Sequence, residues 1–330
     1  MDYQWYPGHM TKARRMMQEN VRLVDLVIEI LDARVPISSR NPDIGQLAQG
    51  KQRLIILSKA DLADPKETQH FLDQFEKEGA AAIAMDARTK KANAQVMKTL
   101  QKITKEKKER DKKRGIIGRP VRAMICGIPN VGKSTFINSL SGRSSAKTGN
   151  KPGVTKGKQW ISFAGLELLD TPGILWPKFE DQKVGLNLAL VGSIREEILD
   201  EEELARKLLA FLIEWYPQML LDRYCDKSTD LESNLRMDLS TGSNVDLNVD
   251  SCGADGDCSE KGRTHNLTDM VAAVQEGGYN DRELHELLAE IAGIRNLLRS
   301  GAEPDPKRAA HLLLDDFRSG RIGAITLDRQ

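Results

Sequence analysis

Short apolar runs alternate with helix-like patterns over the first half of the chain. Runs that are short, rich in Val, Ile and Leu, and bounded by polar or turn residues are typical of buried strands. The predicted strands are Val24–Leu31, Arg53–Leu57, Val121–Cys126, Lys158–Phe163 and Leu166–Leu169. Helices are predicted at Pro65–Glu78, which gathers Phe71 and Phe75 on one side, and at Ser134–Leu140. This alternation indicates parallel βαβ units, and therefore an α/β fold with a mostly parallel sheet and helices on both faces.

Beyond about Val184 the strand signal fades. The segments Glu196–Trp215, Asp281–Leu298 and Pro306–Phe317 carry apolar residues at three- and four-residue spacing, which predicts helices. Between them, Ser228–Asn266 is rich in Ser, Asp, Asn and Gly, as flexible surface insertions are. We therefore expect an α/β domain over residues 1–182 and an all-α domain over 183–330 that carries the insertion at about 228–266.

The chain of 330 residues has a net charge of only +1, but its two halves differ strongly. Residues 1–180 contain 32 basic and 19 acidic side chains, whereas residues 181–330 contain 17 basic and 29 acidic ones. The densest basic segment, Lys98–Arg122, has 11 Lys and Arg and three acids, and it includes the predicted basic connector at 98–120. Such a segment indicates either a surface that binds a polyanion or a solvated helix and linker.

The composition excludes several classes of protein. The four cysteines show no paired metal spacing, and Cys252 and Cys258, which flank a loop containing Asp, match no standard metal loop. The most apolar stretch, Val184–Ile194, is too short to cross a bilayer, and the N-terminus lacks the apolar core of a signal peptide. We expect a cytoplasmic protein in a reduced compartment, without membrane insertion.

The segment Gly127–Ser134 matches the pattern G-x-x-x-x-G-K-[ST] between a predicted strand and a predicted helix. Its backbone N–H groups, with Lys133, would bind the β- and γ-phosphates, and the Ser134 hydroxyl would bind Mg²⁺. Downstream, Asp170 ends a predicted strand and opens Asp-Thr-Pro-Gly173, where the carboxylate can hold Mg²⁺ through water and the glycine N–H can contact the γ-phosphate. The candidate phosphate-binding residues of the loop are Asn130, Val131, Gly132, Lys133, Ser134 and Thr135. The sequence therefore predicts a nucleoside triphosphate site.

The tetrapeptide Ser58-Lys59-Ala60-Asp61 follows a predicted strand and indicates that the base is guanine. An Asp at this place can accept hydrogen bonds from the guanine N1–H and exocyclic amine, and the Lys stem can cover the purine face. Ala87, after the run Ala80–Met85, is a candidate backbone donor to the guanine carbonyl. Ser58 stands where such motifs carry Asn, so an ATP-using enzyme is the alternative if this substitution removes guanine selectivity.

These motifs occur in an inverted order, because the base motif precedes the phosphate loop along the chain. A parallel sheet tolerates this order when old termini are joined and a new break opens on the surface, so we expect a circularly permuted P-loop GTPase domain. The segment after Gly173 moves on hydrolysis in such proteins, and here it leads directly into the helical half.

The chain closely resembles the circularly permuted bacterial GTPases of the ribosome biogenesis GTPase A family over nearly its whole length. The most specific segments are Trp5–Met10, Asp32–Pro42, Gly127–Ser134, Pro152–Thr155, Leu169–Asp181 and Asp315–Gly323. The resemblance implies a GTPase that uses GTP, GDP and Mg²⁺ and acts late in assembly of the large ribosomal subunit. It also implies that this GTPase binds rRNA and ribosomal proteins and is stimulated by the ribosomal particle. We expect the protein to be a monomer.

Many GTPases orient the attacking water with a Gln directly after the glycine of this motif, but here the residue is Ile174. The family resemblance points instead to His9, whose neutral imidazole can orient or polarise water; the alternative is that it caps or packs the first helix. Asn130 resembles the Asn that holds K⁺ in potassium-stimulated GTPases, the alternative being a structural loop contact. Thr155 is the candidate switch threonine for Mg²⁺ and the γ-phosphate.

Contacts with rRNA phosphates are expected from Lys98–Arg122 and from Lys12, Arg14 and Arg15, without strong dependence on RNA sequence. In the acidic helical half, local basic residues would contact RNA or ribosomal protein. An alternative function is an RNA-binding assembly scaffold in which GTP is mainly a structural ligand, because no Gln follows Gly173. Turnover that is stimulated by ribosomal particles would separate the two functions.

Overall fold

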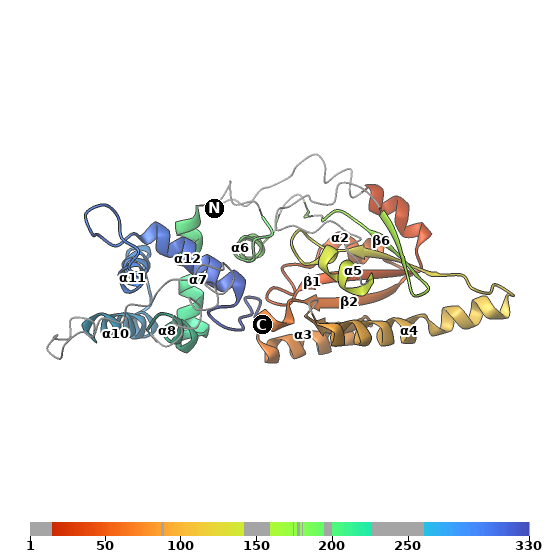
Figure 1. The fold of residues 1–330 in the computed structure, drawn as a ribbon, viewed down its shortest axis with the longest axis horizontal. Helices are drawn as coiled ribbons and strands as arrows, with labels where there is room; N and C mark the ends of the chain where they lie inside the picture. The colour runs from red at the N-terminus through yellow and green to blue at the C-terminus, as the bar shows by residue number, and fades with distance from the viewer. Residues whose placement is uncertain are drawn as a thin grey trace, which may run out of the picture. The chain divides into compact units, whose positions relative to one another are not determined.

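The structure, a computed structural model, describes residues 15–86, 89–141, 159–173, 175–176, 179, 181–194, 200–225 and 261–329. The chain divides into two compact units, the first comprising residues 1–199 and 324–330 and the second residues 200–323 (Figure 1). The boundary expected after residue 182 therefore differs from the division at Leu199, because helix α6 (Gln182–Leu190) packs with the first unit.

The first unit is built on one six-stranded sheet with the strand order β3-β2-β1-β4-β6-β5. Its strands are β1 (Leu26–Asp32), β2 (Gln52–Ser58), β3 (Ala81–Met85), β4 (Val121–Cys126), β5 (Gln159–Phe163) and β6 (Leu166–Asp170). All neighbouring pairs are parallel except β5 with β6, which are antiparallel. The expected α/β fold class with a mostly parallel sheet is confirmed.

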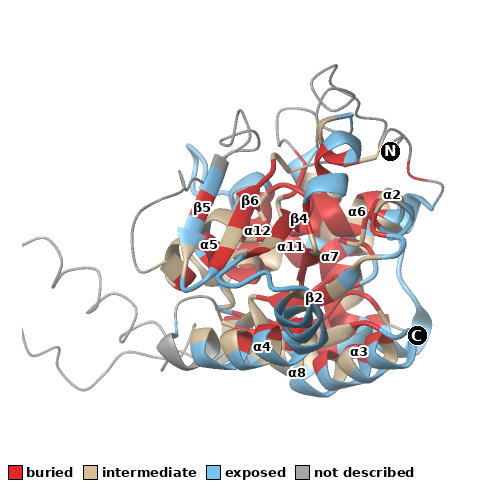
Figure 2. Cartoon of the chain, turned by 90° about the vertical axis from the view of Figure 1, so that its right-hand side faces the viewer, coloured by how far each residue is buried: buried red, intermediate tan, exposed pale blue. Residues whose placement is uncertain are grey.

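Both faces of the sheet are covered by helices. On one face, α3 (Pro65–Lys77) inserts Phe71 and Phe75 against Leu31 of β1, and α2 (Pro42–Leu47) packs beside it. The strand residues that point to the other face are equally buried there, where α4 (Lys90–Lys113) and α5 (Lys133–Ser141) pack. Figure 2 shows the central strands buried and the outer sides of α3 and α4 exposed. Burial on both faces explains why the strands are continuous apolar runs.

The predicted basic connector at 98–120 is mostly a helix. It lies in α4, a helix of 24 residues whose buried side chains Val96, Leu100 and Thr104 recur every four residues. Most of its exposed positions carry Lys, Arg or Glu, so a solvated helical face and a basic surface occur together in one element.

The last described residues return to the first unit after the helices of the second. Ile325 N donates to Leu62 O at 3.0 Å, and Leu327 N donates to Arg34 O at 2.7 Å. Both Ile325 and Leu327 are buried. Residues 324–329, called here the C-terminal tail, therefore complete the packing beside the carboxyl ends of β1 and β2.

Among its described residues, the second unit contains helices and one isolated antiparallel bridge, between Leu298 and Pro304. The helices are α7 (Glu201–Trp215), α8 (Pro217–Cys225), α10 (Lys261–Gly277), α11 (Asp281–Ile294) and α12 (Pro306–Ser319). Asp200, Asn280 and Asp305 cap the N-termini of α7, α11 and α12 through their side chains. The predicted insertion lies largely in residues 226–260, outside the described residues, whereas residues 261–266 already belong to α10. None of the helices described has the length and hydropathy that crossing a bilayer requires.

Candidate nucleotide-binding site

The parallel register brings the loops after β1, β2 and β4 to one edge of the sheet. Asp32, the last residue of β1, lies opposite Ser58, the last residue of β2, and Glu29 lies opposite Cys126, which ends β4. The phosphate loop, Gly127–Ser134, and the base loop, Ser58–Asp61, therefore start beside one another although about 70 residues separate them in sequence. Ligands of open α/β sheets bind at this edge.

The phosphate loop needs glycine where it leaves β4. Gly127 has a φ of 153°, and a Cβ placed there would lie 2.5 Å from Ile30 O of the neighbouring strand. The loop then turns through Asn130, whose φ is 61°, and Val131, which is fully buried, before α5 begins at Lys133. The predicted strand–loop–helix arrangement is thus present, with Ser134 half-buried in the first turn of α5 and Thr135 exposed.

Lys133 is buried inside this loop. Its Nζ donates to Ile128 O at 2.7 Å and to Gly127 O at 3.1 Å. Burial lowers the pKa of Lys133 to about 8, and the nearby carboxylate of Asp170 opposes this shift. The two charged groups are therefore close enough to interact, as a phosphate-binding lysine and a carboxylate that holds magnesium should be.

The segment Asp170–Gly173 lies directly against the phosphate loop. Thr171 Oγ1 donates to Ile125 O of β4 at 2.6 Å, which fixes the start of the segment. A Cβ at Gly173 would lie 2.7 Å from Pro129 N and 2.8 Å from its Cα, closer than any side chain can approach a backbone. Glycine is therefore required at position 173 because the backbone of this segment packs directly against that of the phosphate loop.

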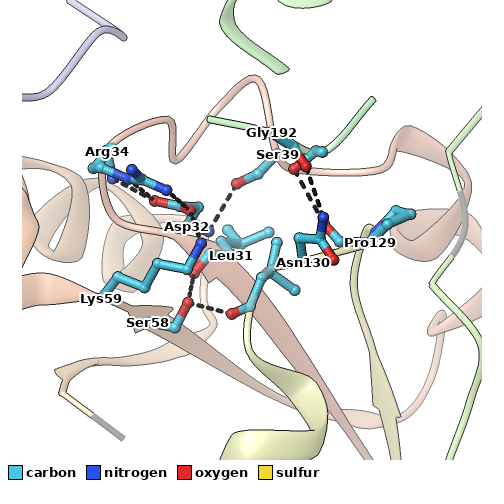
Figure 3. A network of polar contacts seen from close by, with 11 residues as sticks. Leu31, Asp32, Arg34, Ser39, Ser58, Lys59, Pro129, Asn130 and Gly192 are labelled. Atoms are coloured by element: carbon cyan, nitrogen blue, oxygen red, sulfur yellow. Dashed lines mark hydrogen bonds and ion pairs between the residues drawn. The ribbon is translucent and has the colours of Figure 1, made fainter. Parts of the chain in front are cut away.

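The base loop is joined to the phosphate loop by Ser58. Its Oγ lies 2.6 Å from Val131 O and 2.8 Å from Leu31 O, so the single hydroxyl proton can be donated to either carbonyl (Figure 3). Lys59 follows with a left-handed φ of 55°, which turns the chain into the short helix Ala60–Leu62 and leaves Asp61 exposed. The serine thus bridges the two loops from the position where an amide was expected.

A buried ion cluster positions Lys59 and was not predicted from the sequence. Asp32 accepts two hydrogen bonds from the Arg34 guanidinium, at 3.0 and 2.8 Å, and one from Lys59 Nζ at 2.8 Å (Figure 3). Burial alone would raise the pKa of Asp32, but Arg34 and Lys59 outweigh it and hold that pKa well below its ordinary value. The sequence signalled these residues only by the place of Asp32 after a predicted strand and by the family segment Asp32–Pro42.

Asn130 and the end of α6 are also linked. Asn130 Nδ2 donates to Gly192 O at 2.7 Å, and Ser193 Oγ donates to Pro129 O at 3.1 Å (Figure 3). The segment that follows Asp170–Gly173 therefore returns to the phosphate loop. The structural contact weighed for Asn130 is present, and it uses the amide nitrogen, whereas K⁺ binding would use the amide oxygen.

The C-terminal tail adds a second set of unpredicted residues. The buried carboxylate of Asp328 accepts from Ile37 N at 2.7 Å, Ser38 N at 2.8 Å and Ser38 Oγ at 2.6 Å. It also accepts from Asn187 Nδ2 of α6 at 2.9 Å. The tail thereby holds the loop that follows β1, which begins directly after Asp32 and contains Arg34, against α6.

Three predicted site residues lie outside the described residues, namely His9, Ala87 and Thr155, as does Ile174. The other predicted residues, Ser58 to Asp61, Asn130 to Thr135, Asp170 and Gly173, converge at the same edge of the sheet. The donors available near Asp170 suit Mg²⁺. A serine hydroxyl and one carboxylate are hard oxygen ligands, and Mg²⁺ in such sites takes its remaining ligands from water and phosphate. Among the described residues, no three or more His, Cys, Asp or Glu side chains lie together as they would around a protein-bound metal ion. Mg²⁺ bound through one hydroxyl and one carboxylate, with water and phosphate, does not require such a group.

Comparison with known proteins identifies similar GTPases. Residues 122–235 match the family described as 50S ribosome-binding GTPase. "Ribosome biogenesis GTPase A" of Priestia megaterium is 38% identical over 330 residues, which cover 99% of this chain and 97% of that protein. The protein of the same name from Bacillus pumilus is 48% identical over 68% of this chain and 80% of its own length. In fold, the chain is similar to a GDP-bound structure of YlqF, with a TM-score of 0.54 and 23% identity over 96% of this chain and 99% of that one.

Proposed function

Because this chain belongs to the ribosome biogenesis GTPase A family, and is therefore a GTP hydrolase, we propose that it binds the precursor of the large ribosomal subunit and couples GTP hydrolysis to a late step of assembly. The names of its relatives support the ribosomal partner. The observation that carries the proposal is the contact of Ser58 with Val131, because it joins the loop for the base to the loop for the phosphates in one site. We also propose that it acts in the cytoplasm, beside the ribosomes whose assembly it assists.

Each converging residue has a role in this proposal. Asp61 selects guanine, and Lys59, oriented by Asp32, covers the base. Lys133 and the loop N–H groups neutralise charge on the phosphates, and the Gly173 N–H contacts the γ-phosphate. Bound Mg²⁺, held by Ser134 and, through water, by Asp170, would neutralise charge that develops between the β- and γ-phosphates. Thr155 would join the Mg²⁺ site in the GTP state.

We propose that His9 orients or polarises the attacking water, because Ile174 cannot do so. A His9→Ala variant should bind GTP with unchanged affinity and hydrolyse it at least tenfold more slowly, a loss within the usual contribution of a general base. A His9→Gln variant, which keeps a hydrogen-bonding side chain, is the matched control and should retain part of the activity. Equal turnover by the wild type and His9→Ala, with and without ribosomal particles, would remove this role.

We also propose that K⁺, bound by the amide oxygen of Asn130, stimulates hydrolysis. A monovalent cation at this place would supply charge that an arginine supplies in other GTPases. Turnover should be faster in KCl than in NaCl at equal ionic strength, and Asn130→Ala should remove the difference. Equal rates in the two salts would contradict the proposal.

The decisive experiment measures GTP turnover in K⁺ buffer alone, with large-subunit particles, and with small-subunit particles as the control. We expect stimulation by the large subunit only, and stronger stimulation by immature particles than by mature ones. The variant Lys133→Ala, which removes the phosphate contact, should abolish turnover under all three conditions. Binding to large-subunit particles without any change in turnover would instead favour the scaffold function, in which GTP is a structural ligand.

A further inference from the structure

A basic pocket lies at the edge of the sheet opposite the nucleotide loops. It has a volume of about 480 Å³ and is formed where β1 and β2 begin, by Asp25 and by residues 50–53, together with α4 and Arg119. Because β1 has seven residues that rise about 3.3 Å each, the pocket lies roughly 20 Å from the base loop. A ligand here and a nucleotide at the other edge can therefore bind at the same time.

The lining of this pocket is strongly positive. Six cationic side chains line it, against two carboxylates, those of Asp25 and Asp111. The cationic residues are Lys51, Arg53, Lys107, Arg110, Arg114 and Arg119. They come from three separate segments of the chain, so the basic character of the pocket is not merely a consequence of the basic helix α4. An excess of positive charge in a concavity raises the local concentration of anions.

The two carboxylates both pair with Lys107, so they offset part of the positive charge and also fix one wall of the pocket. Asp25 is fixed by Arg122 N at 3.1 Å and binds Lys107 Nζ at 3.0 Å, with Arg119 at 3.9 Å. Lys107 also binds Asp111 at 3.1 Å within α4. These three partly buried groups therefore form a rigid wall made of one lysine and two acids.

Lys51 Nζ donates to Val24 O at 2.8 Å, and Arg53 pairs with Glu29 at 2.9 Å. Arg110 and Arg114 are therefore the lining cations that remain available. Both are exposed, and neither side chain makes a hydrogen bond or ion pair with any other residue in the described part of the chain. Basic residues at this end of α4 also favour the helix through its dipole, at a few tenths of a kcal/mol each. That effect does not explain why they face Lys51, Arg53 and Arg119 across a cavity.

We propose that this pocket binds backbone phosphates of RNA. Its volume falls in the range of sites for small organic ligands, so it has room for a nucleotide and not only for a bare ion. The lining has no aromatic side chain on which a base would stack, so the contacts are to phosphate and carry little sequence preference. The charge of the pocket indicates a polyanion, and the choice of RNA as that polyanion rests on the proposed function.

The test compares two double variants of the full chain that lose the same charge from the same helix. Arg110→Gln/Arg114→Gln alters the pocket, whereas Lys102→Gln/Lys108→Gln alters exposed positions of α4 outside it. The probe is a labelled single-stranded RNA of 20 nucleotides, titrated at several KCl concentrations. The pocket variant should bind about tenfold more weakly near 0.15 M salt, and its slope of log K against log salt should be smaller by about 1.4. The control variant should change much less.

A second titration uses inorganic phosphate and separates a free anion from RNA. The inference is overturned if the two double variants weaken RNA binding equally, or if the pocket variant loses inorganic phosphate but binds RNA as the wild type does. GTP turnover without RNA should be equal in all three proteins. Absence of particle-stimulated turnover in the wild type would defeat the proposed function, whereas the RNA titrations would still decide the role of the pocket.

Discussion

The contact of Asp328 with the loop after β1 allows a quantitative prediction. Asp328→Ala removes a buried carboxylate that accepts four hydrogen bonds, from Ile37 N, Ser38 N, Ser38 Oγ and Asn187 Nδ2, at 2.6 to 2.9 Å. Truncation leaves these donors without their acceptor. The structure therefore predicts that the tail is released from this loop and that the loop opens more often.

The expected loss is about 3 kcal/mol. Hydrogen bonds to a charged group contribute about 1.5–3 kcal/mol each, so four of them set an upper bound near 6–12 kcal/mol. Burial raises the pKa of Asp328, which means that its charged form is costly to bury and that part of this gain is offset. Water entering the space left by the side chain can satisfy some donors. Breaking a buried charged network usually costs about 3–5 kcal/mol of stability, and we expect the loss for Asp328→Ala to lie near the lower end of that range.

Hydrogen–deuterium exchange reports on this loop directly, because two of the donors are the backbone amides of Ile37 and Ser38. A loss of about 3 kcal/mol corresponds to faster exchange of these amides by roughly 150-fold. A peptide from α7, in the other unit, should exchange at its wild-type rate. Mass spectrometry of the full chain can measure both peptides in one experiment.

Asp328→Asn is the matched control. One amide oxygen can still accept from Ile37 N and Ser38 N, and the Ser38 hydroxyl can turn to accept from the new amide, so only the bond from Asn187 is lost. We expect less than about 1.5 kcal/mol, or roughly tenfold faster exchange. Exchange of the Asp328→Ala protein within threefold of the wild type would refute the claim that the tail holds this loop.

Three further predictions concern the nucleotide loops. Gly173→Ala places a Cβ within 2.8 Å of the Pro129 backbone, so relief of about 1–3 kcal/mol of overlap should separate the loops and lower single-turnover GTP hydrolysis by roughly 10- to 100-fold. Ser58→Ala removes the hydroxyl that hydrogen-bonds Val131 O, at a cost of about 1 kcal/mol. Calorimetry should therefore show about fivefold weaker GDP binding, whereas the control Ser58→Thr should bind GDP about as tightly as the wild type. Asp32 has a depressed pKa, so its contribution to stability is present above its ordinary pKa near 3.8 and is lost as the pH falls below that value. In urea unfolding between pH 6 and 3, the free energy of unfolding of Asp32→Asn should therefore fall less steeply with acid than that of the wild type.

The parts of the fold that local patterns control were predictable. The strand at Val121–Cys126 and the helix after the phosphate loop were correctly placed, because apolar runs, Gly127 and the sequence G-K-S act over a few residues. The division between the units was not predictable from the same signals. Helix α6 has the same apolar periodicity as the helices that follow, and its sequence does not indicate whether it packs with the first or the second unit.

The site residues that belong to a sequence motif could be predicted. The residues that only the fold brings together could not. Lys133 and Asp170 follow from spacing and from strand ends. The hydroxyl of Ser58 takes part in joining the loops, which the motif with Asn did not reveal. Asp328 is 291 residues away from Ile37, so their contact depends on the path of the whole chain and leaves no local pattern.

The position of the C-terminal tail also constrains biosynthesis. Domains generally begin to fold in the order in which they are translated. Residues 324–329 belong to the first unit yet are translated after residues 200–323. A nascent chain must therefore be translated through every helix of the second unit before Asp328 can bind the loop after β1. A product that stops before Asp328 therefore lacks the carboxylate that holds Ile37 and Ser38 of that loop.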